Sequence, residues 1–119
     1  MHRGEIYLVD LNGRVGSEQG GSRPAVIVQN DVGNTHSPTT IICPLTSKNK
    51  NMAATHVSLL PEDAGVKQES IVLCEQICVV DKARIKKKLG RITNMKKIED
   101  INEKILISVG LREEKCTQG

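Results

Sequence analysis

The sequence predicts a small, mainly β protein with some α: a strongly bent antiparallel sheet or barrel with one helix packed across it. Five to seven short runs rich in β-branched residues, bounded by turn-forming residues, fill most of the chain before residue 92. The apolar period then becomes helical. With 119 residues and neither a linker nor an internal repeat, we expect a single domain over 1–111 and a frayed tail over 112–119.

A glycine-rich loop separates the first two predicted strands. Residues 5–11, "EIYLVDL", alternate weakly and are rich in β-formers, which predicts a strand. Glycines and polar residues predict a loop over 12–22. Residues 24–30, "PAVIVQN", form a continuous apolar run typical of a strand buried on both faces, and Pro24 stands at its start, where no ladder donor is needed.

Turn signals and short apolar runs alternate through the middle of the chain. In order, they predict a turn at 30–34, a strand at 39–45, a polar run at 46–51, a strand at 55–60, a turn at 61–65 and one or two strands within 70–81.

A closing helix follows. Its apolar positions recur at helical spacing: Met95, Ile98, Ile101, Ile105 and Val109. We expect Thr93 as its N-cap, without a capping box because Lys96 stands at the third position, and Gly110 as its stop.

The composition is that of an ordinary globular protein, with 38% hydrophobic and 26% charged residues and a formal net charge of +3. We expect a cytoplasmic protein without a membrane segment, because no apolar run approaches the roughly 18–20 residues that a membrane helix needs. The N-terminal apolar stretch is short and carries Glu5 and Asp10, which is unlike a signal peptide.

Basic residues concentrate in residues 82–91, "KARIKKKLGR", which hold six Lys and Arg and no acid. Such a segment is able to attract a phosphate backbone. A solvated loop or strand edge kept soluble by lysines is the more common explanation, and we favour it.

The cysteines predict core packing, with no metal, disulfide or cofactor. Cys43, Cys74 and Cys78 lie in apolar strand-like runs, where a thiol behaves as a small hydrophobe. Cys74 and Cys78 lack CxxC spacing, and His36 and His56 show no ligand spacing.

Familiar site motifs are absent from the sequence. It has no Walker loop, HExxH or nucleophile elbow, and "GSEQGG" (16–21) is followed by a strand where a dinucleotide fingerprint needs a helix. With one Tyr, no Phe and no Trp, a generic platform for stacking single-stranded bases is disfavoured.

Polar groups remain at two strand junctions. Arg23 precedes the second strand, and Thr46 and Ser47 follow the third. If these strands pair as a hairpin, residues 23 and 46 lie at the same sheet end. A guanidinium beside a hydroxyl is a suitable receptor for a phosphate oxyanion. The ordinary alternatives, a surface ion pair for Arg23 and a turn for Thr46 and Ser47, stay open.

That receptor would suit RNA scission, which needs no metal when the substrate's 2′-OH is the nucleophile. Arg23 would stabilise charge, because arginine stays protonated and is a poor general base. Glu18 is the loop carboxylate nearest in sequence, and we expect it in proton transfer.

The segments "RGEIYLVDL", "GSEQGGSRPAVIVQND", "SPTTIICPLTS", "THVSL" and "ESIVLCEQICVVDKARI" follow one another over nearly the whole chain. In this order and spacing, the chain resembles the MazF/PemK family of toxin endoribonucleases, the mRNA interferases of bacterial type II toxin–antitoxin systems. The resemblance implies an SH3-like (CcdB/PemK-like) antiparallel barrel with a C-terminal helix. It also implies a cytoplasmic homodimer that takes single-stranded mRNA in its interface groove and is blocked by a MazE-like antitoxin.

Family members cut RNA without metal or cofactor, leaving a 2′,3′-cyclic phosphate and a 5′-hydroxyl. The family's essential arginine and threonine fall on Arg23 and Thr46. The resemblance also implies that the loop glycines Gly20 and Gly21 let the loop approach the RNA backbone. Further positions near the RNA or its bases are Ser17, Glu18, Gln19, Ser47, Glu75 and Gln76.

One position departs from the family's pattern. Many relatives carry a basic residue where this chain has Cys78, and we expect the missing cation to weaken a backbone contact or alter sequence preference. Two alternatives stay open: a CcdB-like toxin that poisons gyrase, and a catalytically silent SH3-like RNA-binding module. Retention of Arg23, Thr46 and "GSEQGG" argues against the gyrase poison.

Overall fold

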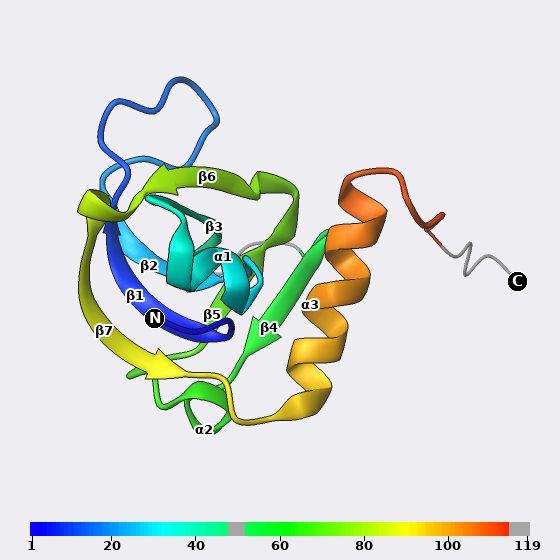
Figure 1. The fold of residues 1–119 in the computed structure, drawn as a ribbon. Coiled ribbons are helices and arrows are strands. Elements are labelled where there is room, and N and C mark those ends of the chain that lie inside the picture. Colours follow the sequence, from blue (N-terminus) through cyan, green and yellow to red (C-terminus); the bar gives the residue numbers. More distant parts are fainter. Residues whose placement is uncertain (48–51, 115–119) are drawn as a thin grey trace, which may run out of the picture.

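The computed structural model describes residues 1–47 and 52–114 (Figure 1). It contains a seven-stranded antiparallel sheet, short helical segments between strands and one longer C-terminal helix. The strands are β1 (Glu5–Asp10), β2 (Ser22–Ile27), β3 (Thr39–Thr46), β4 (His56–Leu59), β5 (Ser70–Leu73), β6 (Cys78–Asp81) and β7 (Ile85–Arg91). The α-helices are α1 (Asp31–His36), α2 (Pro61–Ala64) and α3 (Met95–Ser108), and the 3-10 turns are η1 (Cys74–Gln76) and η2 (Lys82–Arg84).

The sheet curls because β3 bends between two partners. Its first half pairs with β6 over Thr39–Ile42, and its end pairs with β5 at Leu45 and Thr46. The main path runs β4-β5-β3-β2-β1-β7. The predicted mainly β architecture with a C-terminal helix is confirmed. Among the described residues no ladder joins β7 back to β4 or β6, so the sheet is strongly curved but not a closed barrel (Figure 1).

Both faces of β2 are buried, as its continuous apolar run predicted. Successive side chains of a strand point to opposite faces. Val26 packs in one cluster with Cys43, Leu45 and residues of α3, while Ala25 and Ile27 pack in another. The sheet therefore has a core on each side. Cys43 and Cys74 are fully buried in the first cluster, which confirms their predicted packing role.

Helix α3 begins at Met95 with Asn94 as its N-cap, so the prediction of Thr93 was wrong by one residue. The Asn94 side chain accepts a hydrogen bond from the Lys96 backbone N–H (3.1 Å) and donates one to Asp63 (2.8 Å). The Thr93 hydroxyl instead donates to the Asp63 carbonyl (3.3 Å). The hydrogen bond from Asn94 to Asp63 of α2 thus favours Asn94 over Thr93 as the N-cap.

The predicted stop at Gly110 is confirmed. Gly110 has φ +79°, and the N–H groups of Gly110 and Leu111 donate to the carbonyls of Ile107 and Leu106, which is a Schellman motif. Of the predicted apolar face, Ile98, Ile101 and Ile105 pack on the core, whereas Met95 and Val109 at the two ends are exposed.

Residues 31–36 form the helix α1, where the sequence predicted a turn over 30–34. The Asn30 side chain accepts from the Gly33 N–H (2.8 Å) and caps the helix, so the polar residues taken as turn formers act as a helix start. The predicted turn at 61–65 likewise contains the single helical turn α2, closed by Gly65 at φ +69°.

The basic segment 82–91 forms η2 and the edge strand β7, as the strand-edge interpretation predicted. In the predicted tail, Arg112 forms an ion pair with Glu103 of α3 (2.7 Å), and residues 115–119 lie outside the described part. Residues 48–51 of the predicted polar run also lie outside it. None of the described helices combines the length and apolarity needed to cross a membrane.

The Glu5 carboxylate links the N-terminal residues to β7 through a hydrogen bond and an ion pair. Glu5 is 6% exposed; it accepts hydrogen bonds from the His2 N–H (2.6 Å) and the Tyr7 hydroxyl (3.0 Å) and pairs with the Lys88 ammonium (2.7 Å). Burial acts to raise the pKa of Glu5, but the hydrogen bonds from Lys88, His2 and Tyr7 outweigh it and lower the pKa to about 2.

We therefore expect acid to remove the stabilisation that Glu5 provides. A carboxyl with a depressed folded-state pKa stabilises the fold above its unfolded value of 4.5 and loses that effect as the pH falls toward about 2. Glu5→Gln should lower the free energy of unfolding at pH 7 by about 1–3 kcal/mol and flatten its pH dependence in that window, as measured by urea unfolding. Glu103→Gln, which breaks an exposed ion pair, is the matched control and should change stability by less than about 1 kcal/mol. Equal acid sensitivity of wild type and Glu5→Gln would contradict this assignment.

Candidate functional site

Arg23 and Thr46 lie at the same end of the sheet and line one cavity. The β2–β3 ladder pairs Ala25 with Pro44 and Val26 with Cys43, and continuing this register by two residues places Arg23 opposite Thr46. Opposed residues of antiparallel strands point to the same face. Both residues line a cavity of about 670 Å³, hereafter the Arg23 cavity.

Four segments build the Arg23 cavity. Its walls come from the start of β2, the end of β3, residues 65–68 with Ser70 at the start of β5, and Leu89 of β7. Thr46 is 8% exposed, and Ser47 beside it is exposed. The site thus gathers residues that lie far apart in the sequence at one open sheet end.

The glycine-rich loop fixes the base of the Arg23 side chain. The Nε–H of Arg23 donates to the Gly20 carbonyl (2.9 Å), and the next residue, Gly21, has φ +71°, a conformation that favours glycine. Within residues 1–47 and 52–114, the two terminal guanidinium nitrogens have no hydrogen-bond partner. The Nε–H group of Arg23 is therefore fixed by the loop, while its terminal N–H groups are available to a ligand.

Lys67 was not found by sequence reasoning. It lines the Arg23 cavity from the stretch between α2 and β5 and is exposed there. No motif marked it, because its position depends on how this stretch folds against β3. Lys67 adds a second positive charge to the Arg23 cavity.

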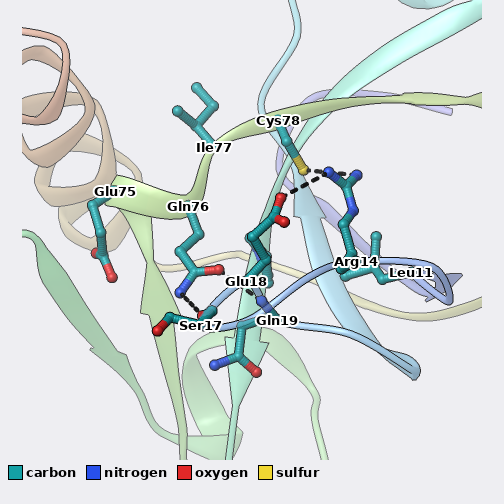
Figure 2. Close-up of a pocket in the computed structure, with 10 residues that line it drawn as sticks. Leu11, Arg14, Ser17, Glu18, Gln19, Glu75, Gln76, Ile77 and Cys78 are labelled. Carbon is teal, nitrogen blue, oxygen red and sulfur yellow. Dashed lines mark hydrogen bonds and ion pairs between the residues drawn. The ribbon is translucent and has the colours of Figure 1, made fainter.

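A second cavity, of about 350 Å³, lies between the loop and η1 (Figure 2). We call it the loop cavity. Gln76 of η1 closes it by holding the loop: its Oε1 accepts from the Gln19 N–H (2.8 Å), and its Nε2 donates to the Ser17 carbonyl (3.3 Å). The loop residues predicted near RNA are therefore attached to the predicted residue Gln76.

Glu18 lines the loop cavity and is not among the residues of the Arg23 cavity. Its carboxylate accepts from the Val15 N–H (2.9 Å) and lies 4.0 Å from an Arg14 nitrogen. Arg14 also donates to the Cys78 sulfur (3.3 Å), and Figure 2 shows the guanidinium held between Cys78 and Glu18. Burial raises the pKa of the Cys78 thiol, and Arg14 only partly opposes this.

Glu75 faces a different set of partners. Its carboxylate accepts from the Thr55 hydroxyl (2.9 Å) and pairs with His56 (3.2 Å). The His56 Nδ1 accepts from the Ala53 N–H (3.1 Å), so the proton facing Glu75 is on Nε2. Glu75 thereby ties η1 to β4.

The predicted residues therefore divide between two cavities. Arg23, Thr46 and Ser47 share the Arg23 cavity, while Ser17, Glu18, Gln19, Glu75 and Gln76 share the loop cavity. Gly20 links the two through its contact with Arg23. In the part of the chain that the structure describes, no three His, Cys, Asp or Glu residues gather as a metal site.

Residues 2–109 match the family model described as PemK-like, MazF-like toxin of type II toxin–antitoxin systems. The chain is 46% identical over 112 residues to Endoribonuclease MazF of Staphylococcus saprophyticus, which covers 93% of this chain and 92% of that protein.

Solved structures share the fold. An endoribonuclease in complex with its cognate antitoxin, from a mycobacterial species, is 25% identical with a TM-score of 0.77, covering 94% of this chain and 97% of that chain. MazF from Deinococcus radiodurans, at 22% identity and a TM-score of 0.80, covers 92% and 96% and shares the fold.

Proposed function

The chain belongs to the PemK-like, MazF-like toxins of type II toxin–antitoxin systems, and we propose that it cuts single-stranded mRNA at the Arg23 cavity by means of the substrate's own 2′-OH. Endoribonuclease activity is that of its relative from S. saprophyticus. The observation that carries the proposed site is the register that sets Arg23 opposite Thr46, with the terminal guanidinium nitrogens available.

The chemistry is an internal displacement at phosphorus. The 2′-oxygen attacks the adjacent phosphorus, the bond from phosphorus to O5′ breaks, and the 2′-OH proton leaves to a base. O5′ takes up a proton as it departs. The products are a 2′,3′-cyclic phosphate and a 5′-hydroxyl, and the balance requires neither water as nucleophile nor a cofactor.

Arg23 supports this step by charge. Its free N–H groups donate in a planar fork to the phosphate oxygens, where negative charge grows in the transition state. The Thr46 hydroxyl donates one further hydrogen bond and helps fix the phosphate. A phosphate held at two points is oriented as well as stabilised, which lowers the entropic cost of alignment.

Partners follow from the same family. The mycobacterial relative was solved with its cognate antitoxin, and a MazE-like antitoxin covering the RNA site is the partner that we propose here. We also assign to this chain a cytoplasmic location and a homodimer that binds RNA between its protomers.

Incubation with a long single-stranded RNA in EDTA tests the proposal. Cleavage at defined sequences, with products that end in a cyclic phosphate, is the expected result. Inhibition of DNA supercoiling by gyrase without RNA cleavage would favour the CcdB-like alternative. RNA binding without either activity would favour the catalytically silent module.

Substitution of Glu18 provides a second test of the site. Because its carboxylate holds the Val15 N–H and lines the loop cavity, we expect Glu18→Gln to lower kcat by less than tenfold. A general base contributes about 10²–10⁴-fold. A loss of that size with unchanged thermal stability would instead support the proton-transfer role predicted from the sequence.

A further inference from the structure

The Arg14 guanidinium lines the loop cavity, where its contacts with Cys78 and Glu18 are weak. One of its N–H groups donates to the Cys78 sulfur at 3.3 Å, and the Glu18 carboxylate lies 4.0 Å away, at ion-pair but not hydrogen-bond distance. A guanidinium carries five N–H donors, and a thiol is a weak acceptor. The Arg14 side chain is 25% exposed, so a ligand can reach it. Most of its donor capacity is left for that ligand.

The guanidinium is nevertheless held in place. Arg14 belongs to the loop between β1 and β2, and Cys78 begins β6 on the opposite wall. Gln76 fastens the same loop at residues 17 and 19, and the Arg84 guanidinium fastens its start through the Asp10 and Asn12 carbonyls (3.0 and 3.2 Å). A donor fork fixed in this way is suited to selecting a planar partner.

The surroundings favour a neutral ring over a phosphate. Leu11, Pro44 and Ile77 supply apolar surface, and a volume of about 350 Å³ lies in the usual range of small-ligand sites. Glu18 and Glu75 also line the cavity, so its carboxylates outnumber its one arginine. A phosphate would be repelled by the carboxylates and would gain little from the apolar wall. A nucleobase would use both.

We propose that Arg14 reads a guanine base in the loop cavity, donating two of its remaining N–H groups to O6 and N7. Guanine presents two acceptors on that edge, whereas adenine presents an amino donor beside N7, which would face another donor. Arg14 is thus a residue that sets the sequence preference of this chain. The inference rests on the proposed function, since the guanine is part of the RNA that reaches the Arg23 cavity.

Sequencing the ends of cleavage products from a long RNA tests the assignment. We expect wild type to prefer guanine over adenine at one fixed position relative to the cut by about 5- to 150-fold, as a good bidentate contact provides. Arg14→Ala should lose this preference, and Arg14→Lys, which keeps the charge without the fork, should lose most of it. Arg112→Ala, which removes an exposed arginine beyond the end of α3, should cut with the wild-type preference.

Binding to a short RNA of the preferred sequence tests the role of Arg14 without measuring cleavage. In the Arg23→Ala background, 7-deazaguanosine at the selected position should weaken binding at least fivefold. It should have no further effect when Arg14 is also alanine.

Two outcomes overturn the assignment. If Arg14→Ala weakened binding equally for all RNA sequences, and reduced the salt dependence of binding by about one phosphate contact, Arg14 would contact the RNA backbone and not a base. An unchanged preference would remove any role for it in recognition. Failure of the wild type to cut RNA at all would contradict the proposed function, while binding of a long RNA in which every guanosine is replaced by 7-deazaguanosine would still report on Arg14.

Discussion

Arg23→Ala is expected to lower kcat for RNA cleavage by about 10²–10³-fold, the cost of removing a donor that stabilises transition-state charge. The terminal nitrogens of Arg23 have no hydrogen-bond partner within the described ranges, so within the fold the substitution removes only the hydrogen bond from Nε to the Gly20 carbonyl. Arg23→Lys should recover only part of the activity, since an ammonium keeps the charge without the planar fork. Initial rates on a short RNA containing the cleavage sequence measure both variants.

Arg112→Ala is the matched control for Arg23→Ala. It also removes an arginine, but one that pairs with Glu103 on the exposed side of α3. It should leave kcat unchanged. Because the Arg23 Nε–H also holds the Gly20 carbonyl, thermal unfolding of each variant must accompany the rates. Activity of Arg23→Ala within tenfold of wild type would remove Arg23 from the chemistry.

The strand positions could be predicted because their causes are local. Alternating or continuous runs of β-branched residues mark β1 to β5. Each of these five strands begins within two residues of its predicted start. Strand β2 begins at Ser22, earlier than predicted, because β1 pairs with it there (Asp10 with Ser22). Such a partner cannot be read from composition.

The Arg23 cavity was partly predictable for the same reason. Hairpin pairing of two neighbouring strands brings residues 23 and 46 to one sheet end whatever lies between them. Lys67 was missed because the stretch that carries it has no periodic pattern, and only its packing brings it to the cavity.

Cys78 shows how tertiary structure adds to an inference from one position. From the sequence, Cys78 implied that a cation was missing. In the structure, the Arg14 guanidinium lies against the Cys78 sulfur, so the loop brings a positive charge to the place where the strand lacks one. The two residues are 64 positions apart in the sequence, so no argument based on spacing reveals their contact.

Helix caps were the least predictable detail. Thr93 and Asn94 are both good N-cap residues, and local preference does not separate them. The buried Asp63 carboxylate, which receives the Asn94 amide, decides between them.

The second large effect concerns the substrate. Replacing the 2′-OH of the nucleotide before the cut by hydrogen removes the nucleophile of the proposed reaction, while every phosphate and base contact remains. We expect cleavage at that site to fall below detection in EDTA and binding to change by no more than a few-fold. Neighbouring 2′-deoxy substitutions, one nucleotide to either side, should leave cleavage largely intact and serve as the matched control.

This single-atom substitution tests the central claim most directly, because it leaves the protein untouched. The account predicts no cut at the deoxy position, while the all-ribose RNA is cut to a 2′,3′-cyclic phosphate and a 5′-hydroxyl. Equal cleavage of the deoxy substrate would show that the nucleophile comes from elsewhere, and would contradict the mechanism assigned to Arg23 and Thr46.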